Sequence, residues 1–191
     1  MSATAVVTAP AATSGLTTWN LDPSHLDVGF AVRHLMISTV KGRFAGVKGT
    51  VSVLGDDFRT ATVDVTIDAA SVDTREPQRD AHLRSADFFD VEQFPTLTFK
   101  SRRVQANGAD RFTLTGDLTI HGVTREVVLD VASEGMGPDP WGGQRAGFSA
   151  KGLVKRSDFG LTWNQLLELG GVAVGDDVKL SIDVELIRQA V

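Results

Sequence analysis

The side chains of this sequence that could carry out chemistry are few and widely spaced. Asp22, Ser24 and His25 supply the carboxylate, hydroxyl and imidazole of a hydrolytic site. Adjacency in sequence does not orient a nucleophile toward its base, so a hydrolase that uses Ser24 and His25 is a minor hypothesis. The other histidines are His34, His82 and His121. Isolated histidines are more often turn or core residues than metal ligands, so we predict no metal site and interpret His121 as a turn residue.

The wider sequence offers no further catalytic signature. It contains no nucleophile elbow, zinc-protease helix, phosphate-binding loop or dinucleotide fingerprint. It has no cysteine, which excludes disulfides, thiolate catalysis and cysteine-ligated zinc. The net charge of −5 argues against a nucleic-acid partner, because such binders concentrate Lys and Arg on one face. We therefore predict that the protein is not an enzyme and uses no cofactor.

The N-terminal residues 1–18 are rich in Ala, Thr and Ser and contain no Lys or Arg. A secretory signal needs a basic start and a continuous apolar stretch, which Thr8, Pro10 and Thr13 interrupt here. We predict a disordered tail over 1–18, one domain over 19–191 and a cytoplasmic protein. No apolar run approaches the roughly 18 residues of a membrane-spanning helix. The oligomeric state, a homodimer included, is left open.

Most of the chain alternates apolar and polar residues with period two, which is typical of strands that are buried on one face. The alternation is clearest over 26–34, 63–67, 112–120 and 178–186. Gly42, Gly46 and Gly49 interrupt the strand predicted over 40–54, and glycines inside strands usually mark bulges or coiling. Mostly short connections and the absence of a long helical pattern predict an all-β, antiparallel barrel of about eight strands. A sandwich is the main rival.

The stretch from 74 to 94 breaks this pattern. We expect Thr74 to cap a short helix that ends near Arg84, with Pro77 in its first turn. An apolar cluster follows it: Phe88, Phe89 and Phe94. The stretch therefore predicts a segment that closes one end of the barrel, although an ordinary crossover connection fits the same pattern. A second irregular segment, 158–171, could also cover a barrel mouth.

The inward faces of the predicted strands carry almost no charge. An eight-stranded barrel either fills its interior with side chains or keeps a cavity for one small ligand, and periodicity does not distinguish the two. The mixture of Phe with Val, Ala and Gly favours a cavity, which would select an apolar ligand. The residues predicted to line it are Phe30, Val32, Phe44, Phe99, Phe112, Leu114, Leu118 and Phe148.

Three polar residues are flanked by apolar positions and are candidates for meeting the polar end of a ligand: Arg33, His34 and His82. An equally good interpretation is that they pair with Asp side chains or backbone groups and hold the strands in place.

Several motifs of the sequence resemble those of the YceI-like family of lipocalin-like, polyisoprenoid-binding proteins. They are Asp22-Pro23-Ser24-His25, Phe30, Val32-Arg33-His34-Leu35-Met36, Gly42-x-Phe44, His82-Leu83-Arg84-Ser85-x-Asp87-Phe88-Phe89-Asp90, Phe94-Pro95, Gly116-x-Leu118-Thr119-Ile120-His121-Gly122-Val123-Thr124 and Asp158-Phe159-Gly160-Leu161. The resemblance runs from about Trp19 to Arg188.

This resemblance implies an extended barrel whose apolar pore binds, stores or transports an isoprenoid chain, such as a polyprenyl lipid or a quinone tail. It implies neither catalytic residues nor a metal. Many relatives are exported with a cleaved leader, a pattern from which this sequence departs. The alternatives are a filled barrel that acts as an interaction or stress-related module without a stoichiometric lipid, and a lipid-modifying hydrolase.

Overall fold

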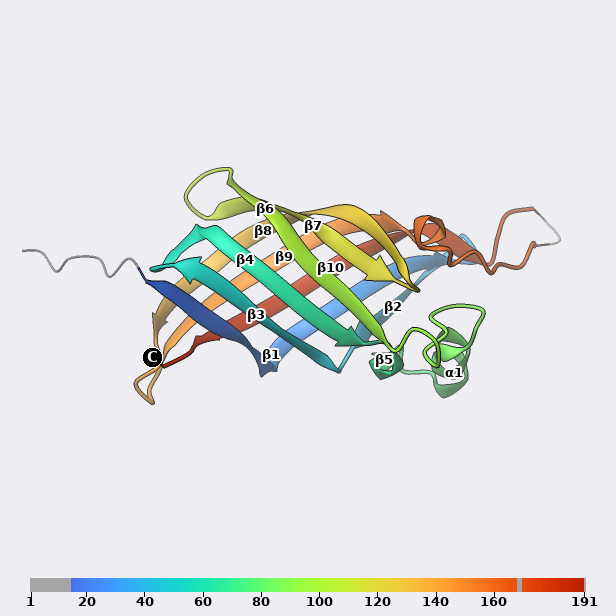
Figure 1. The fold of residues 1–191 in the computed structure, drawn as a ribbon. Helices are drawn as coiled ribbons and strands as arrows, with labels where there is room; N and C mark the ends of the chain where they lie inside the picture. The colour runs from blue at the N-terminus through green and yellow to red at the C-terminus, as the bar shows by residue number, and fades with distance from the viewer. Residues whose placement is uncertain (1–14, 168–169, 191) are drawn as a thin grey trace, which may run out of the picture.

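The computed structural model describes residues 15–167 and 170–190 of the protein. Within them the strands form one antiparallel sheet in the order β10-β9-β8-β7-β6-β4-β3-β1-β2-β5. β10 also pairs with β1, and this pairing closes the sheet into a barrel (Figure 1). The predicted antiparallel barrel is confirmed, and the rival sandwich, which needs two separate sheets, is excluded.

The elements follow one another as strands with three short helical segments. They are β1 (Leu16–His34), β2 (Ser38–Phe44), β3 (Val47–Leu54), β4 (Asp57–Asp68), η1 (Ala69–Ser71), β5 (Val72–Asp73), α1 (Pro77–Arg84), β6 (Thr96–Ala106), β7 (Arg111–Ile120), β8 (Val123–Pro138), β9 (Gln144–Lys155), η2 (Arg156–Phe159) and β10 (Val174–Arg188).

Two of the barrel strands are interrupted along their length. β2 and β3 lie in succession beside β1, with Phe44 paired to Val28 and Thr50 paired to Asn20. β4 and β5 follow the same course on the other side of β2 and β3. If β2 with β3 and β4 with β5 are each counted as one interrupted strand, the ten labelled strands of the described chain become eight. The predicted number is therefore confirmed.

β1 continues through the Asp-Pro-Ser-His sequence at 22–25, although these residue types favour turns. Leu21 pairs with Leu186 and Leu26 with Val184, so the four residues form a bulge opposite Glu185. These turn-forming residues bulge out of the strand but do not end it, because pairing with β10 resumes directly after them.

The start of β1 differs from prediction. β1 begins at Leu16, so the last residues of the predicted 1–18 tail belong to the sheet, while residues 1–14 lie outside the described residues. β8 continues to Pro138, through two glycines, because pairing with β9 resumes after a register shift between Ser133 and Gly135. No helix of the described chain is long and apolar enough to cross a membrane.

The turn between β7 and β8 agrees with its prediction. His121 and Gly122 occupy it with φ of 51° and 71°. Positive φ at both central residues is the geometry that favours a tight hairpin turn. Phe94 packs against the imidazole of His121, with ring centroids 4.6 Å apart. The turn is thereby tied to the segment that precedes β6.

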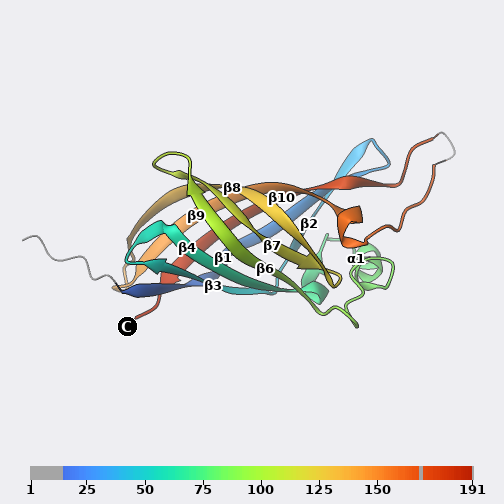
Figure 2. The same ribbon diagram turned by 45° about the horizontal axis from the view of Figure 1, so that its top comes forward.

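The segment over 74–94 lies at one end of the barrel, as predicted, with α1 beside that opening in both views (Figures 1 and 2). The predicted cap is wrong. The carboxylate of Glu76 caps α1 by accepting hydrogen bonds from the amides of Gln78 (3.2 Å) and Arg79 (2.6 Å). Thr74 lies too far upstream and instead donates its amide to buried Asp80 (2.9 Å).

The two ends of the barrel are closed differently. At one end, which we call the packed end, side chains of the strands fill the interior: Trp19, Val51, Val53, Ala146 and Leu186. At the other, which we call the covered end, the segment 74–94 lies beside the opening, and the buried side chains of Phe159 and Leu161, in η2 and just after it, join the core. The larger core cluster extends from the barrel to this covered end through Leu83, Phe89 and Phe159.

Candidate functional site: an apolar cavity inside the barrel

The barrel encloses a cavity of about 310 Å³. Every strand except β5 contributes to its wall, as do α1 and the segments that follow α1 and η2. Among the described lining residues, Arg156 is the only one with a charged side chain. The cavity is therefore suited to an apolar guest, because each polar group buried without a partner would cost a few kcal/mol.

All of the residues predicted to line a pore face this cavity: Phe30, Val32, Phe44, Phe99, Phe112, Leu114, Leu118 and Phe148. Period-two alternation was sufficient to find them because each lies on the inward side of its strand. Their contact with a ligand stays a prediction.

Aromatic side chains join the cavity wall to both ends of the barrel. Phe44 packs against Phe30 of β1 and against Phe89 of the covered end, with ring centroids 5.7 Å and 5.6 Å apart. At the packed end, Phe58 lies 4.8 Å from Phe148 and 5.4 Å from Trp19. The cavity is thus bounded by strand side chains at one end and by the covering segments at the other.

Arg156 is a cavity residue that the sequence analysis missed. Its guanidinium donates to the carbonyls of Gly175 (2.9 Å), Leu161 (2.6 Å) and Trp163 (2.9 Å), and to Val174 at 3.4 Å. Burial lowers its pKa, although nearby Asp176 opposes the shift. The guanidinium thereby joins the residues that follow η2 to the start of β10. Alternation of β9 through Phe148, Ala150, Gly152 and Val154 would have placed residue 156 on the inward face, and this signal could have found it.

None of the three head-group candidates lines the cavity. Arg33 is exposed and donates to the carbonyl of Met36 (2.5 Å), so it supports the hairpin between β1 and β2. His34 lies at the end of β1, where it pairs with Val174. No hydrogen bond or ion pair joins the three in the described part of the chain.

His82 does not line the cavity but takes part in an aromatic cluster that includes one lining residue, Phe88. Its imidazole lies edge-on to Phe88 and Trp163, with ring centroids 5.0 Å and 4.7 Å apart. Its Nε2 is 2.8 Å from the carboxylate of Asp87. These contacts place His82 in the packing of the covered end. The geometry therefore favours a structural role for His82 over contact with a ligand head group.

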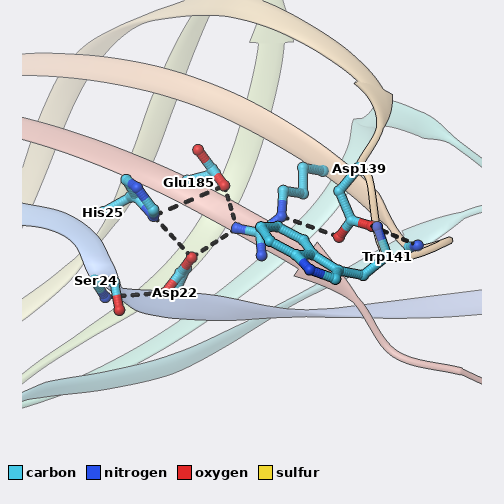
Figure 3. Close-up of polar contacts among 8 residues, drawn as sticks. Asp22, Ser24, His25, Asp139, Trp141 and Glu185 are labelled. Atoms are coloured by element: carbon cyan, nitrogen blue, oxygen red, sulfur yellow. Dashed lines mark hydrogen bonds and ion pairs between the residues drawn. The ribbon is translucent and has the colours of Figure 1, made fainter.

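The hydrolytic residues of the sequence lie in a polar cluster on β1, β9 and β10 (Figure 3). The buried carboxylate of Asp22 accepts from His25 Nδ1 (3.0 Å) and from Arg145 (2.7 Å). Ser24 contributes its backbone amide to Asp22 (2.9 Å), and no hydrogen bond from its hydroxyl to His25 exists among the described residues. The nucleophile-to-base contact that a hydrolase requires is therefore missing from this arrangement.

The charges of this cluster stabilise one another. The hydrogen bond from His25, assisted by the amide of Ser24 and by Arg145, lowers the pKa of Asp22 to about 2. The same hydrogen bond and the charge of Glu185 raise the pKa of His25. Glu185, then Asp22 and Asp139, raise the pKa of Arg145. The cluster therefore fastens the bulge of β1 to β9 and β10.

Asp22, His25 and Glu185 also place one potential metal ligand each within 4.8 Å of one another. The guanidinium of Arg145 contacts both carboxylates, however, and donates to Asp139 at 3.1 Å as well. A cation would have to displace this arginine. The geometry is that of an ion-pair network, and we assign no metal to it.

A closed antiparallel barrel with an apolar cavity defines the class of lipocalin-like barrels, which enclose space for a small ligand. The family model of the YceI-like domain matches residues 19–186 of the chain. The chain belongs to the YceI-like family, as its motifs predicted.

Individual relatives agree with this assignment. Protein YceI of Salmonella newport is 42% identical over 165 residues, which cover 86% of this chain and 83% of that protein. The crystal structure of a YceI protein of Campylobacter jejuni is 34% identical, with a TM-score of 0.73, and the match covers 83% of this chain and 90% of that one.

Two more distant structures share the fold. BcnA of Burkholderia cenocepacia matches with a TM-score of 0.75 at 22% identity, over 86% of this chain and 98% of that chain. A domain of Saccharophagus degradans, described as polyisoprenoid-binding and implicated in plant cell wall breakdown, matches with a TM-score of 0.64 at 17% identity. That match covers 88% of this chain and 97% of the domain.

Proposed function

We propose that this protein binds an isoprenoid-type lipid, a polyprenyl chain or a quinone tail, inside its barrel. The observation that carries the proposal is the enclosed cavity, whose described lining is apolar except for Arg156. A polyisoprenoid-binding domain with the same fold supports the class of ligand. The apolar wall selects against charged or sugar-like ligands, whose polar groups would be buried without partners.

The size of the cavity bears on how the chain is held. A volume of about 310 Å³ lies at the lower end of the roughly 300–1,000 Å³ range of ligand pockets. Each buried CH₂ group contributes about 0.8 kcal/mol. Burial of a few isoprene units would therefore offset much of the entropy that the lipid chain loses on binding. We expect affinity to rise with chain length until the cavity is filled, and head-group preference to be weak.

The ligand enters or leaves, in this proposal, at the covered end. The packed end is filled by Trp19 and its neighbours, whereas the covered end is closed by segments that are not part of the barrel wall. Arg156, the first residue of η2, lies on the cavity wall at this end. A phosphate or quinone oxygen placed there would meet the one charged group of the described wall.

The test is a titration of polyprenyl lipids of increasing length, in a vesicle-free assay, against the parent protein and two variants. Phe112→Asp places a charge on the cavity wall and should abolish binding. Ala150→Phe fills the cavity with an apolar ring and should do the same without adding a charge. If both variants remain folded by circular dichroism and bind as the parent does, the cavity is not the binding site.

The alternative function is an interaction module with a filled interior. It predicts no stoichiometric lipid on organic extraction and mass spectrometry of the purified protein. The cavity of about 310 Å³ argues against it, since a filled barrel would leave no such space. Storage or transport of the lipid and a cytoplasmic location stay predictions.

A further inference from the structure

The hairpin between β1 and β2 ends in three consecutive apolar residues that no part of the described chain buries. Leu35, Met36 and Ile37 are 37%, 53% and 80% exposed. Both figures that show the whole chain place this hairpin at the covered end, where it projects beyond the barrel (Figures 1 and 2). We refer to these three residues as the hairpin tip.

The backbone of the hairpin tip is unusual for its sequence. Leu35 and Met36 have φ of 50° and 61°, and the amide of Ile37 donates to the carbonyl of His34 at 3.2 Å. A tight turn with positive φ at both central positions favours Asn-Gly, because other side chains are strained there. Large apolar side chains at these positions strain the turn and expose apolar surface to water. Strain of this kind is characteristic of functional sites.

The hairpin also differs from the rest of the molecule in charge. The protein has a net charge of −5, yet the hairpin over 28–44 contains Arg33, Lys41 and Arg43 and no Asp or Glu. All three are exposed, and only Arg43 has an acidic partner among the described residues, Asp73 at 3.6 Å. An apolar tip with cations behind it is the arrangement that inserts into a lipid surface and attracts its anionic head groups.

We infer that the hairpin tip docks the protein on a bilayer with anionic lipids, with the covered end facing the membrane. A protein partner is a poorer fit, because stable protein interfaces bury about 800 Å² on each side and a three-residue tip offers far less. A bilayer accepts one apolar tip without shape complementarity. This orientation rests on the proposed function in one respect only: it brings the end where lipid would enter the cavity next to the lipid source.

The absence of cysteine permits a direct test of this orientation. Ile37→Cys and Trp141→Cys each create a single labelling site for an environment-sensitive fluorophore, at two side chains of nearly equal exposure, 80% and 81%, at opposite ends of the barrel. On adding vesicles of equimolar phosphatidylcholine and phosphatidylglycerol, we expect a blue shift for the label at 37 and none at 141. A shift at 141 alone, or at neither position, would overturn the inference.

A second variant removes the tip without harming the turn. The triple change Leu35→Asn, Met36→Gly and Ile37→Thr supplies residues that the turn geometry prefers, so the protein should stay folded. We expect its affinity for the same vesicles, measured by flotation, to fall roughly tenfold or more, because the inserted apolar area is lost. Trp141→Ser is the matched control and should bind as the parent does, although tryptophan often anchors proteins at membrane surfaces.

Two further measurements separate this inference from neighbouring explanations. Lys41→Glu should weaken binding to anionic vesicles and leave weak binding to pure phosphatidylcholine unchanged. The triple variant should retain polyprenyl binding in the vesicle-free assay. Loss of vesicle binding with cavity binding retained supports a docking role; unchanged vesicle binding refutes it, whatever the cavity holds. If the parent protein does not bind vesicles but forms dimers through the hairpin tip, the partner is a second copy of the chain and membrane docking is refuted.

Discussion

The two ends of the barrel are closed by different physical means. At the packed end, Trp19 is fully buried among Val53, Ala146 and Leu186, which are all side chains of barrel strands. At the covered end, segments outside the barrel wall are attached through apolar side chains such as Phe159 and also through polar groups, among them Arg156 and Asp80. Apolar packing within the wall is lost only when the barrel unfolds, whereas polar attachments of a covering segment can break locally. The packed end is therefore suited to hold the barrel together, and the covered end to admit the ligand of the proposed function.

The largest effect should follow from Trp19→Ala. This change removes the largest buried side chain of the packed end, so we expect the free energy of unfolding to fall by about 3–5 kcal/mol. Chemical denaturation followed by circular dichroism measures it. Trp19→Phe is the control: the indole Nε1 has no hydrogen-bond partner among the described residues, so the smaller ring loses packing but no hydrogen bond. A loss below about 1 kcal/mol for Trp19→Ala would show that the packed end is not what stabilises the barrel.

Arg156→Met should have a smaller and local effect. Methionine keeps an apolar stem on the cavity wall but leaves the carbonyls of Leu161, Trp163 and Gly175 without their donor. We expect a loss of about 2 kcal/mol, concentrated at the covered end. Hydrogen exchange should accelerate at amides over 161–167 and stay unchanged at β3 and β10. Uniform acceleration across the barrel would contradict the distinction between the two ends.

Asp80→Ala tests the other attachment of the covered end. The amide and hydroxyl of buried Thr74 lose their acceptor, while Arg79 still donates to the Thr74 hydroxyl at 2.7 Å. We expect a loss of about 1–2 kcal/mol and faster exchange in α1. Asp87→Ala, which breaks the exposed pair with His82, is the matched control and should cost less than about 1 kcal/mol. Equal losses for the two variants would mean that burial of Asp80 is not what fastens α1.

The two ends also differ in how well the sequence predicted them. Alternation identified the barrel strands and the cavity wall, because period two depends only on which side of a strand faces inward. It did not identify Glu76 as the cap of α1 or Asp80 as the partner of Thr74. These contacts depend on how a covering segment meets the barrel in three dimensions, and no local pattern encodes that.

Residue types alone did not predict which polar residues lie on the cavity wall. Arg33, His34 and His82 were chosen because they combine polarity with apolar neighbours, yet each faces away from the cavity or packs outside it. Arg156 lies one residue beyond the end of β9, where the strand pattern gives way to η2. The hydrophobic pattern therefore predicts which residues form the wall, and the few polar residues that enter it must be found by extending the alternation through the strand ends.

The smallest effect concerns acid, and it should act on the packed end, where the cluster around Asp22 joins β1 to β9 and β10 (Figure 3). The pKa of Asp22 is lowered to about 2 from an ordinary value of 3.8. A carboxyl group with a lowered pKa stabilises the folded state above its unfolded pKa, and that contribution is lost as the pH falls from about 4 to about 2. Because part of the interaction is screened by solvent, we expect it to amount to about 1 kcal/mol.

His25 should act in the opposite direction and more weakly, since its side chain is 61% exposed. Its pKa is raised, so its contribution is complete below pH 6.5 and disappears as the pH rises through the higher folded value. Denaturation of the parent and of Asp22→Asn between pH 2 and pH 8 tests both. The variant should be less stable than the parent at pH 5, and the two curves should converge near pH 2. Above pH 6.5 the variant should show a smaller slope than the parent, because His25 loses its carboxylate partner at position 22 and keeps only the charge of Glu185. Hydrogen exchange at acid pH should accelerate first beside the bulge of β1; acceleration that begins at α1 would place the acid-sensitive contacts at the covered end and contradict the assignment.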